Sequence, residues 1–144
     1  MSDIDDSAAG LTDAEKRLRA LLRFWTVLFA AGAVSFGADP DRSTGSLNIL
    51  PGASLPPSSE KYWNALAVSL MATLTTLCAL AATDVRRRRV FVWPVLVSKA
   101  VSSGMYLTRY REQRQTPYLV GGAVDGSIFA VTAARFLQAR RRAR

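Results

Sequence analysis

Long stretches without charge, each bordered by basic residues, constrain this chain more than any other feature. Residues 62–83 and 24–38 carry no charged side chain, and residues 115–134 carry only Asp125. A soluble helical bundle needs a polar face on each helix, whereas these stretches are apolar all round. The pattern predicts an all-α fold, an integral membrane four-helix bundle.

The predicted transmembrane domain covers residues 15–137, with spans at about 20–37, 62–83, 90–106 and 117–134. Residues 1–14 are acidic and small, which predicts a disordered N-terminal tail. The run from Thr12 to Glu15 fits a capping box at the start of the first helix. Residues 38–59 are rich in Pro, Gly and Ser, which favours a loop, and residues 138–144 form a basic tail.

The distribution of basic residues predicts the orientation of the spans. Lys and Arg gather in the N-terminal region, in the arginine run at 86–89 and in the C-terminal tail. The two remaining loops hold fewer of them. By the positive-inside rule we expect a multi-pass protein of the cell membrane with both termini in the cytoplasm. The first span also has the parts of a signal peptide, so cleavage after it stays open.

The formal charge of +8 does not point to nucleic acid. The basic residues flank apolar stretches and are not interleaved with aromatic residues that could stack on bases. Anionic lipid at the cytoplasmic face is the expected partner of these charges. A membrane protein partner or a homo-oligomer is left open.

Few residue types suited to catalysis or to metal binding are present. Histidine is absent and the single cysteine, Cys78, lies inside an apolar stretch, where a small buried side chain is the simplest interpretation. We find no GxSxG motif and no metal-ligand cluster in the sequence. We therefore expect no catalytic residue, no cofactor and no metal, and no enzymatic activity.

Two apolar stretches each carry one charge near the middle, Lys99 and Asp125. Lys99 lies about 15 Å along a helix from Arg89, and Asp125 about 15 Å from Arg135. In antiparallel spans both charges would lie near the centre of the bilayer, where an unpaired charge is costly. The sequence therefore predicts an ion pair at the centre of a candidate polar site that also includes Ser102, Ser103 and Tyr106.

Gly122 and Gly126 have the GxxxG spacing on the fourth predicted span. Glycines at this spacing allow a neighbouring helix to approach closely. Since they flank Asp125, we expect them to pack against the helix that carries Lys99.

The order of the pieces resembles a known group of membrane proteins. A short first span and a Pro/Gly-rich loop are followed by YWNALAVSLMATL at 62–74, VSKAVSSG at 97–104 and VDG at 124–126. This layout, over residues 20–137, is similar to that of the small four-helix bacterial membrane proteins described as DoxX-like. The resemblance implies a four-helix fold in a bacterial inner membrane, and it supplies no catalytic residues.

Two functions stay open at this point. In the first, the chain is an accessory or structural membrane protein in which Lys99 and Asp125 hold two helices together. In the second, that pair is the site of a protein that binds or transports a small molecule, lipid, quinone or proton. A dry and tightly packed pair favours the first, and an open pocket beside it favours the second.

Overall fold

The computed structural model describes residues 10–55 and 61–141. Five α-helices and two short 3-10 helices are present in these ranges: α2 (Asp13–Ala38), α3 (Pro40–Gly45), η1 (Ser46–Ile49), α4 (Lys61–Thr83), η2 (Arg89–Phe91), α5 (Val92–Gln113) and α6 (Thr116–Arg141). No strand occurs in the described part of the chain, so the predicted all-α class is confirmed.

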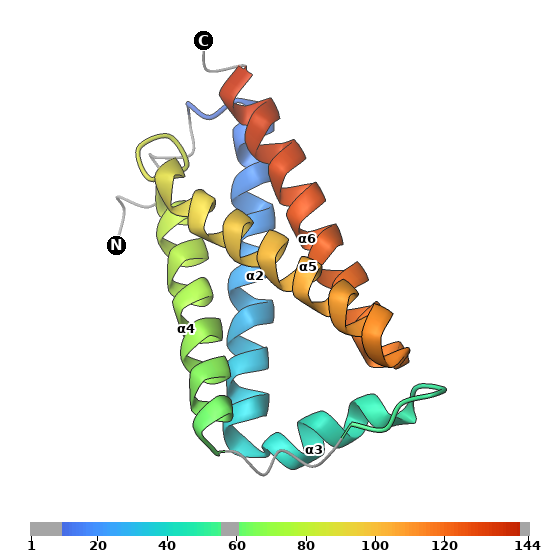
Figure 1. Ribbon diagram of the computed structural model, residues 1–144. Coiled ribbons are helices and arrows are strands. Elements are labelled where there is room, and N and C mark those ends of the chain that lie inside the picture. The colour runs from blue at the N-terminus through green and yellow to red at the C-terminus, as the bar shows by residue number, and fades with distance from the viewer. Residues whose placement is uncertain (1–9, 56–60, 142–144) are drawn as a thin grey trace.

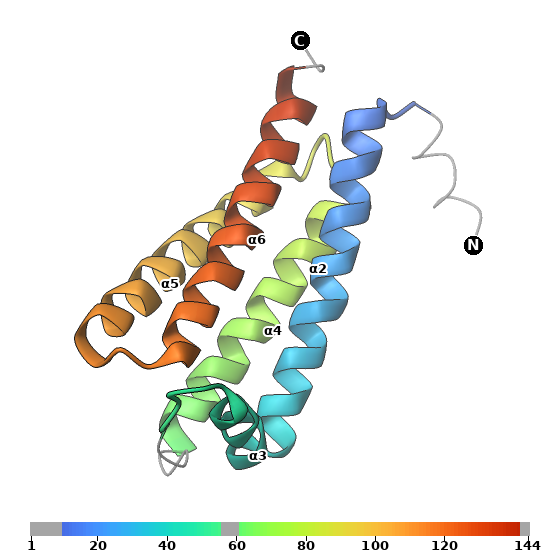
Figure 2. The ribbon, with the colours of Figure 1, turned by 90° about the vertical axis from the view of Figure 1, so that its right-hand side faces the viewer.

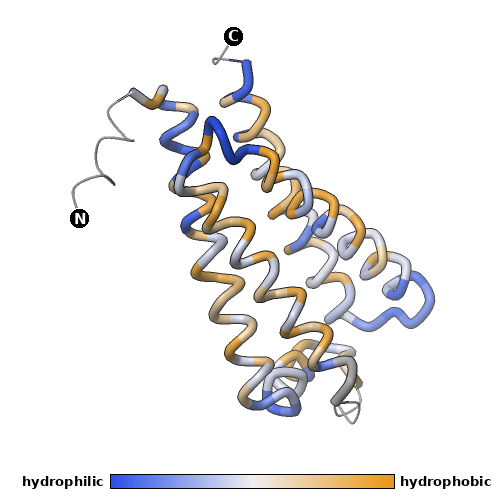
Figure 3. Tube along the Cα trace, turned by 90° about the vertical axis from the view of Figure 1, so that its left-hand side faces the viewer, coloured by the Kyte–Doolittle hydropathy of each residue, from blue (hydrophilic) through white to orange (hydrophobic). Residues whose placement is uncertain are grey.

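Four of the helices, α2, α4, α5 and α6, are long and apolar enough to cross a membrane by length and composition. Figure 3 shows hydrophilic residues gathered at the two ends of these helices and hydrophobic residues between them. One end, which we call the basic end, holds the start of α2, the turn at 84–91 and the end of α6 (Figure 1). The other end, called the opposite end, holds α3 and the turn between α5 and α6.

The start of α2 is the capping box that the sequence predicts. Thr12 Oγ1 accepts a hydrogen bond from the backbone N–H of Glu15 at 3.3 Å, and Glu15 Oε2 accepts one from the Thr12 N–H at 2.8 Å. Two amides that the first helical turn leaves free are thereby satisfied.

The helices α5 and α6 continue beyond the spans predicted from the sequence. α5 ends at Gln113, where Arg114 adopts a left-handed conformation with φ 56°, and its last turns hold an ion pair between Arg109 and Glu112. The expected loop from about residue 107 to 116 is therefore mostly helix. α6 reaches Arg141, so the described part of the basic tail, residues 138–141, is helical as well. Charged residues mark where a span leaves the membrane, but the helix itself can continue beyond that point.

The predicted loop at 38–59 contains two short helices. The Asp39 side chain accepts a hydrogen bond from the Arg42 N–H at 2.9 Å, and Pro40 occupies the first turn of α3. Asn48 exchanges two hydrogen bonds with the backbone of Leu55, and the Thr116 hydroxyl donates to the Pro51 carbonyl. The described part of the connection is thus held by its own hydrogen bonds and joined to the start of α6.

The four long helices form two pairs that meet mainly near the basic end. α2 lies along α4 and α5 lies along α6, and the pairs separate toward the opposite end (Figures 1 and 2). Buried residues follow the same division. Among the described side chains, and counted from the basic end, burial stops at Phe29 on α2, at Leu74 on α4 and at Leu96 on α5. The shared core therefore occupies the half of the molecule near the basic end.

Candidate functional site

The candidate site is centred on an ion pair between α5 and α6. Lys99 Nζ lies 2.9 Å from Asp125 Oδ1, and the two side chains are 13% and 12% exposed. The contact is the one predicted from the matching depths of the two residues. Its burial makes it more costly to break than a pair on the surface, because either charge alone would stay in an apolar environment.

Ser102 engages the second oxygen of the carboxylate. Its hydroxyl donates a short hydrogen bond to Asp125 Oδ2 and lies 3.4 Å from the Lys99 carbonyl, one helical turn back. Both carboxylate oxygens of Asp125 are thus bound by α5. A carboxylate held in this way by an ammonium group and a hydroxyl is well suited to joining two helices.

Phe29 on α2 completes the surroundings of Lys99. The ammonium nitrogen lies 4.8 Å from the centre of the Phe29 ring, a cation–π contact. Phe29 is not among the site residues predicted from the sequence. A signal was present, because Phe29 continues the helical spacing of Leu18, Leu22 and Trp25, all of them buried on one face of α2.

Ser103 and the two glycines bring α5 and α6 close together beside the ion pair. Ser103 Oγ donates to the Gly122 carbonyl at 2.8 Å. A Cβ atom added at Gly122 would lie 2.9 Å from two side-chain atoms of Leu107, and one at Gly126 would lie 3.1 Å from Ser103 Oγ. The close approach expected from the glycine spacing is therefore present at both positions.

Tyr106 takes a different role from the one expected. Its ring packs over Gly121, where an added Cβ would lie 3.2 Å from the ring, and the residue is 40% exposed. No hydrogen bond joins its hydroxyl to Lys99 or Asp125 in the described part of the chain. Of the five predicted site residues, Lys99, Asp125 and Ser102 contact one another directly, Ser103 lies beside them, and Tyr106 packs between the helices one turn away.

Two further contacts join the helices nearer the basic end. Trp25 Nε1 donates a hydrogen bond to Thr132 Oγ1 at 3.0 Å and links α2 to α6. Arg19 Nε donates to the Ala82 carbonyl at 3.0 Å, near the end of α4. The sequence pattern predicts a lipid interface for the basic residues of α2. Arg19 is instead buried and satisfies a carbonyl that the end of a helix leaves free.

The basic end is held by an ion pair between Glu15 and Arg86. Arg86 Nε and Nη2 lie 2.8 and 2.9 Å from the two carboxylate oxygens of Glu15, and Nη2 also donates to the Gly10 carbonyl. Hydrogen bonding to this carboxylate raises the pKa of the Arg86 guanidinium. In the same turn, the backbone N–H groups of Arg87 and Arg86 donate to Asp84 and lower the pKa of its carboxyl group. These contacts order the arginine-rich turn against the start of α2.

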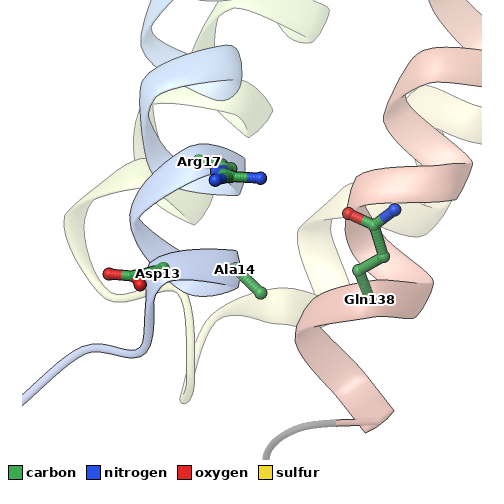
Figure 4. A pocket seen from close by; sticks show the side chains of 4 residues that line it. All are labelled: Asp13, Ala14, Arg17 and Gln138. Carbon is green, nitrogen blue, oxygen red and sulfur yellow. The ribbon is translucent and has the colours of Figure 1, made fainter.

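A polar cavity and a mostly apolar groove lie away from the ion pair. A polar cavity of about 110 Å³ at the basic end separates the start of α2 from the end of α6, and it is lined by Asp13, Ala14, Arg17 and Gln138 (Figure 4). A larger, mostly apolar groove of about 530 Å³ lies near the opposite end between α2, α3 and α4. The polar cavity is lined by both an acidic and a basic side chain, and the apolar groove is open to the outside. Neither lining by itself indicates one class of ligand.

The described residues contain no cluster of three or more His, Cys, Asp or Glu side chains that could hold a metal ion. Cys78 is buried in the shared core, among residues of the same hydrophobic cluster.

Comparisons with protein-family models, with curated proteins and with solved structures find no match. The similarity in layout to the DoxX-like group therefore stays a prediction.

Proposed function

We propose that the chain is a non-enzymatic, multi-pass protein of the cell membrane with a structural or accessory role, and that Lys99 and Asp125 hold α5 to α6 inside the bilayer. The observation that carries the proposal is that Asp125 binds partners from the same chain with both oxygens, Lys99 with one and Ser102 with the other. Each oxygen of this carboxylate already accepts a hydrogen bond from α5, so the place of Asp125 in the fold is explained without a ligand.

The proposed orientation places the basic end in the cytoplasm. The arginine run at 86–89 and the ends of α2 and α6 lie at that end, as the positive-inside rule requires. Both termini are then cytoplasmic, and α3 lies on the outer side. Four helices of sufficient length and apolar character support the multi-pass arrangement.

A second candidate is the binding of a small molecule, lipid, quinone or proton at the ion pair. It is favoured by the residual exposure of both side chains, 13% for Lys99 and 12% for Asp125, at the depth where the two helix pairs begin to separate. Water or a ligand entering from the opposite end would reach the pair there.

The experiment that separates the two candidates replaces both charges and examines what the chain does in its native membrane. A structural role predicts that Lys99→Met with Asp125→Leu yields a stable protein that still purifies with the same membrane components as the wild type. Each single variant should lose yield, because the remaining charge has no partner. A stable double variant that loses its cellular phenotype would instead favour the binding role.

A further inference from the structure

We propose that the basic end binds the phosphate of one anionic phospholipid between the guanidinium groups of Arg89 and Arg140. The proposal rests on the membrane location proposed above. It goes beyond a general attraction of basic residues to lipid, because it names two arginines among the many at this end of the molecule.

The site is a small crevice where η2, the start of α2 and the end of α6 meet. Arg89 and Arg140 both line it, together with the buried side chains of Leu18, Val85 and Phe136. Two arginines from segments far apart in the sequence therefore border one crevice with a mostly apolar lining. Guanidinium groups bind phosphate oxygens through paired, charge-assisted hydrogen bonds.

The positive charge of this crevice is not neutralised within the described part of the chain. Glu15 also lines the crevice, but Arg86 binds both of its carboxylate oxygens. Arg89 donates its Nε to the Arg86 carbonyl at 2.9 Å, which orients the guanidinium group. Neither Arg89 nor Arg140 belongs to an ion pair between described residues.

The depth of both arginines matches that of lipid headgroups. Arg89 precedes Lys99 by ten residues, about 15 Å along a helix, which is half of a hydrocarbon core about 30 Å thick. The Arg140 guanidinium lies 5.9 Å from the ring of Phe136 and thus extends back toward the membrane centre. Phe136 follows Asp125 by eleven residues, about 16 Å along the helix. Since Asp125 contacts Lys99, the guanidinium groups of Arg89 and Arg140 lie at similar depth.

The surface below the crevice suits a lipid better than a free phosphate ion. Val90 in η2 is 60% exposed, Trp93 near the start of α5 is 50% exposed, and Leu137 near the end of α6 is 48% exposed. The Trp93 ring meets the edge of Phe136 at a centroid distance of 5.5 Å. An acyl chain attached to the bound phosphate would lie along this apolar surface, and tryptophan is a residue typical of the membrane interface.

The test measures lipid binding to the purified full-length chain in detergent by native mass spectrometry. The wild type should bind one phosphatidylglycerol molecule more tightly than phosphatidylcholine, and inorganic phosphate should compete poorly. Arg89→Gln with Arg140→Gln should weaken phosphatidylglycerol binding by roughly a hundredfold, because each arginine loses a charge-assisted hydrogen bond to the phosphate worth about a tenfold factor.

The control is Arg87→Gln with Arg141→Gln, which removes the same charge from the same end. Arg87 lies 3.8 Å from Asp84 in an exposed ion pair and is itself 90% exposed, and Arg141 is exposed as well, so this pair should change the affinity by less than about twofold. Equal losses in the two variants would overturn the proposal in favour of diffuse attraction. Effective competition by inorganic phosphate would reassign the crevice to a free anion.

If the Arg89 and Arg140 variant fails to fold, the wild-type chain alone still tests the proposal, through its affinities for phosphatidylglycerol and phosphatidylcholine. Equal affinity for phosphatidylglycerol and phosphatidylcholine would overturn it without any variant. A wild-type chain that stays soluble without detergent would instead contradict the proposed membrane location, so the two failures are distinguishable.

Discussion

Trp25 on α2 and Thr132 on α6 share a hydrogen bond of 3.0 Å between the indole Nε1 and the threonine Oγ1. Thr132 is fully buried and Trp25 is 9% exposed. The bond joins the two helix pairs at the shared core. One face of α6 contacts α2 through Thr132 and α5 through Asp125. It gives the shared core a polar contact that fixes how α2 and α6 are rotated toward each other.

Removal of this bond should cost a measurable fraction of stability. Thr132→Val keeps the volume but leaves the Trp25 N–H without its acceptor, and we expect a loss of about 0.6 to 1.7 kcal/mol. The matched control is Thr76→Val, since the Thr76 hydroxyl bonds only to the Ala72 carbonyl of its own helix and is exposed. Thermal unfolding in detergent should separate the two variants, and an equal change in both would mean that the bond contributes nothing.

The Lys99–Asp125 pair should show strong coupling in a double-mutant cycle. Lys99→Met or Asp125→Leu alone should lower stability by about 3 kcal/mol, because each leaves a buried charge without its partner. The double variant should recover most of the loss. The measurement is the free energy of unfolding in detergent or lipid, and additive losses would refute the coupling.

Gly122 should tolerate a side chain poorly, whereas Gly104 should tolerate one well. A Cβ at Gly122 would meet Leu107 at 2.9 Å, while one at Gly104 would meet nothing within 4 Å. We expect Gly122→Ala to destabilise the protein by about 1 to 3 kcal/mol through overpacking. Gly104→Ala should be neutral or stabilising by up to about 1 kcal/mol, because alanine favours the helix. Comparable melting temperatures for the two variants would argue against close packing of α5 and α6 at Gly122.

The orientation of the chain is testable by cysteine labelling. With Cys78→Ala as background, a cysteine at Ser46 should react with a membrane-impermeant reagent from outside the cell. A cysteine at Gln138 should react only after the membrane is opened. Both positions are exposed, so poor access would not explain a negative result. Labelling of both positions from the same side would contradict the proposed topology.

Much of the arrangement along the helices could be predicted from the sequence. Charged residues are costly in hydrocarbon, so the uncharged stretches mark the four long helices and the lone charges mark a pair at matching depth. Lys99 and Asp125 are in contact as predicted, and Gly122 and Gly126 lie where α6 approaches α5. The constant rise of an α-helix is what turns sequence position into depth.

Which residues of the long helices contact one another depended largely on the tertiary structure. The roles of Phe29 beside Lys99, of Thr132 opposite Trp25 and of Arg19 at the end of α4 were not predicted. Neither was the separation of the two helix pairs toward the opposite end. A lipid tail and a packed side chain are almost equally apolar, so apolar residues facing lipid and apolar residues facing another helix look alike in the sequence. Periodicity defines the faces of each helix, but only the folded structure decides which neighbour each face meets.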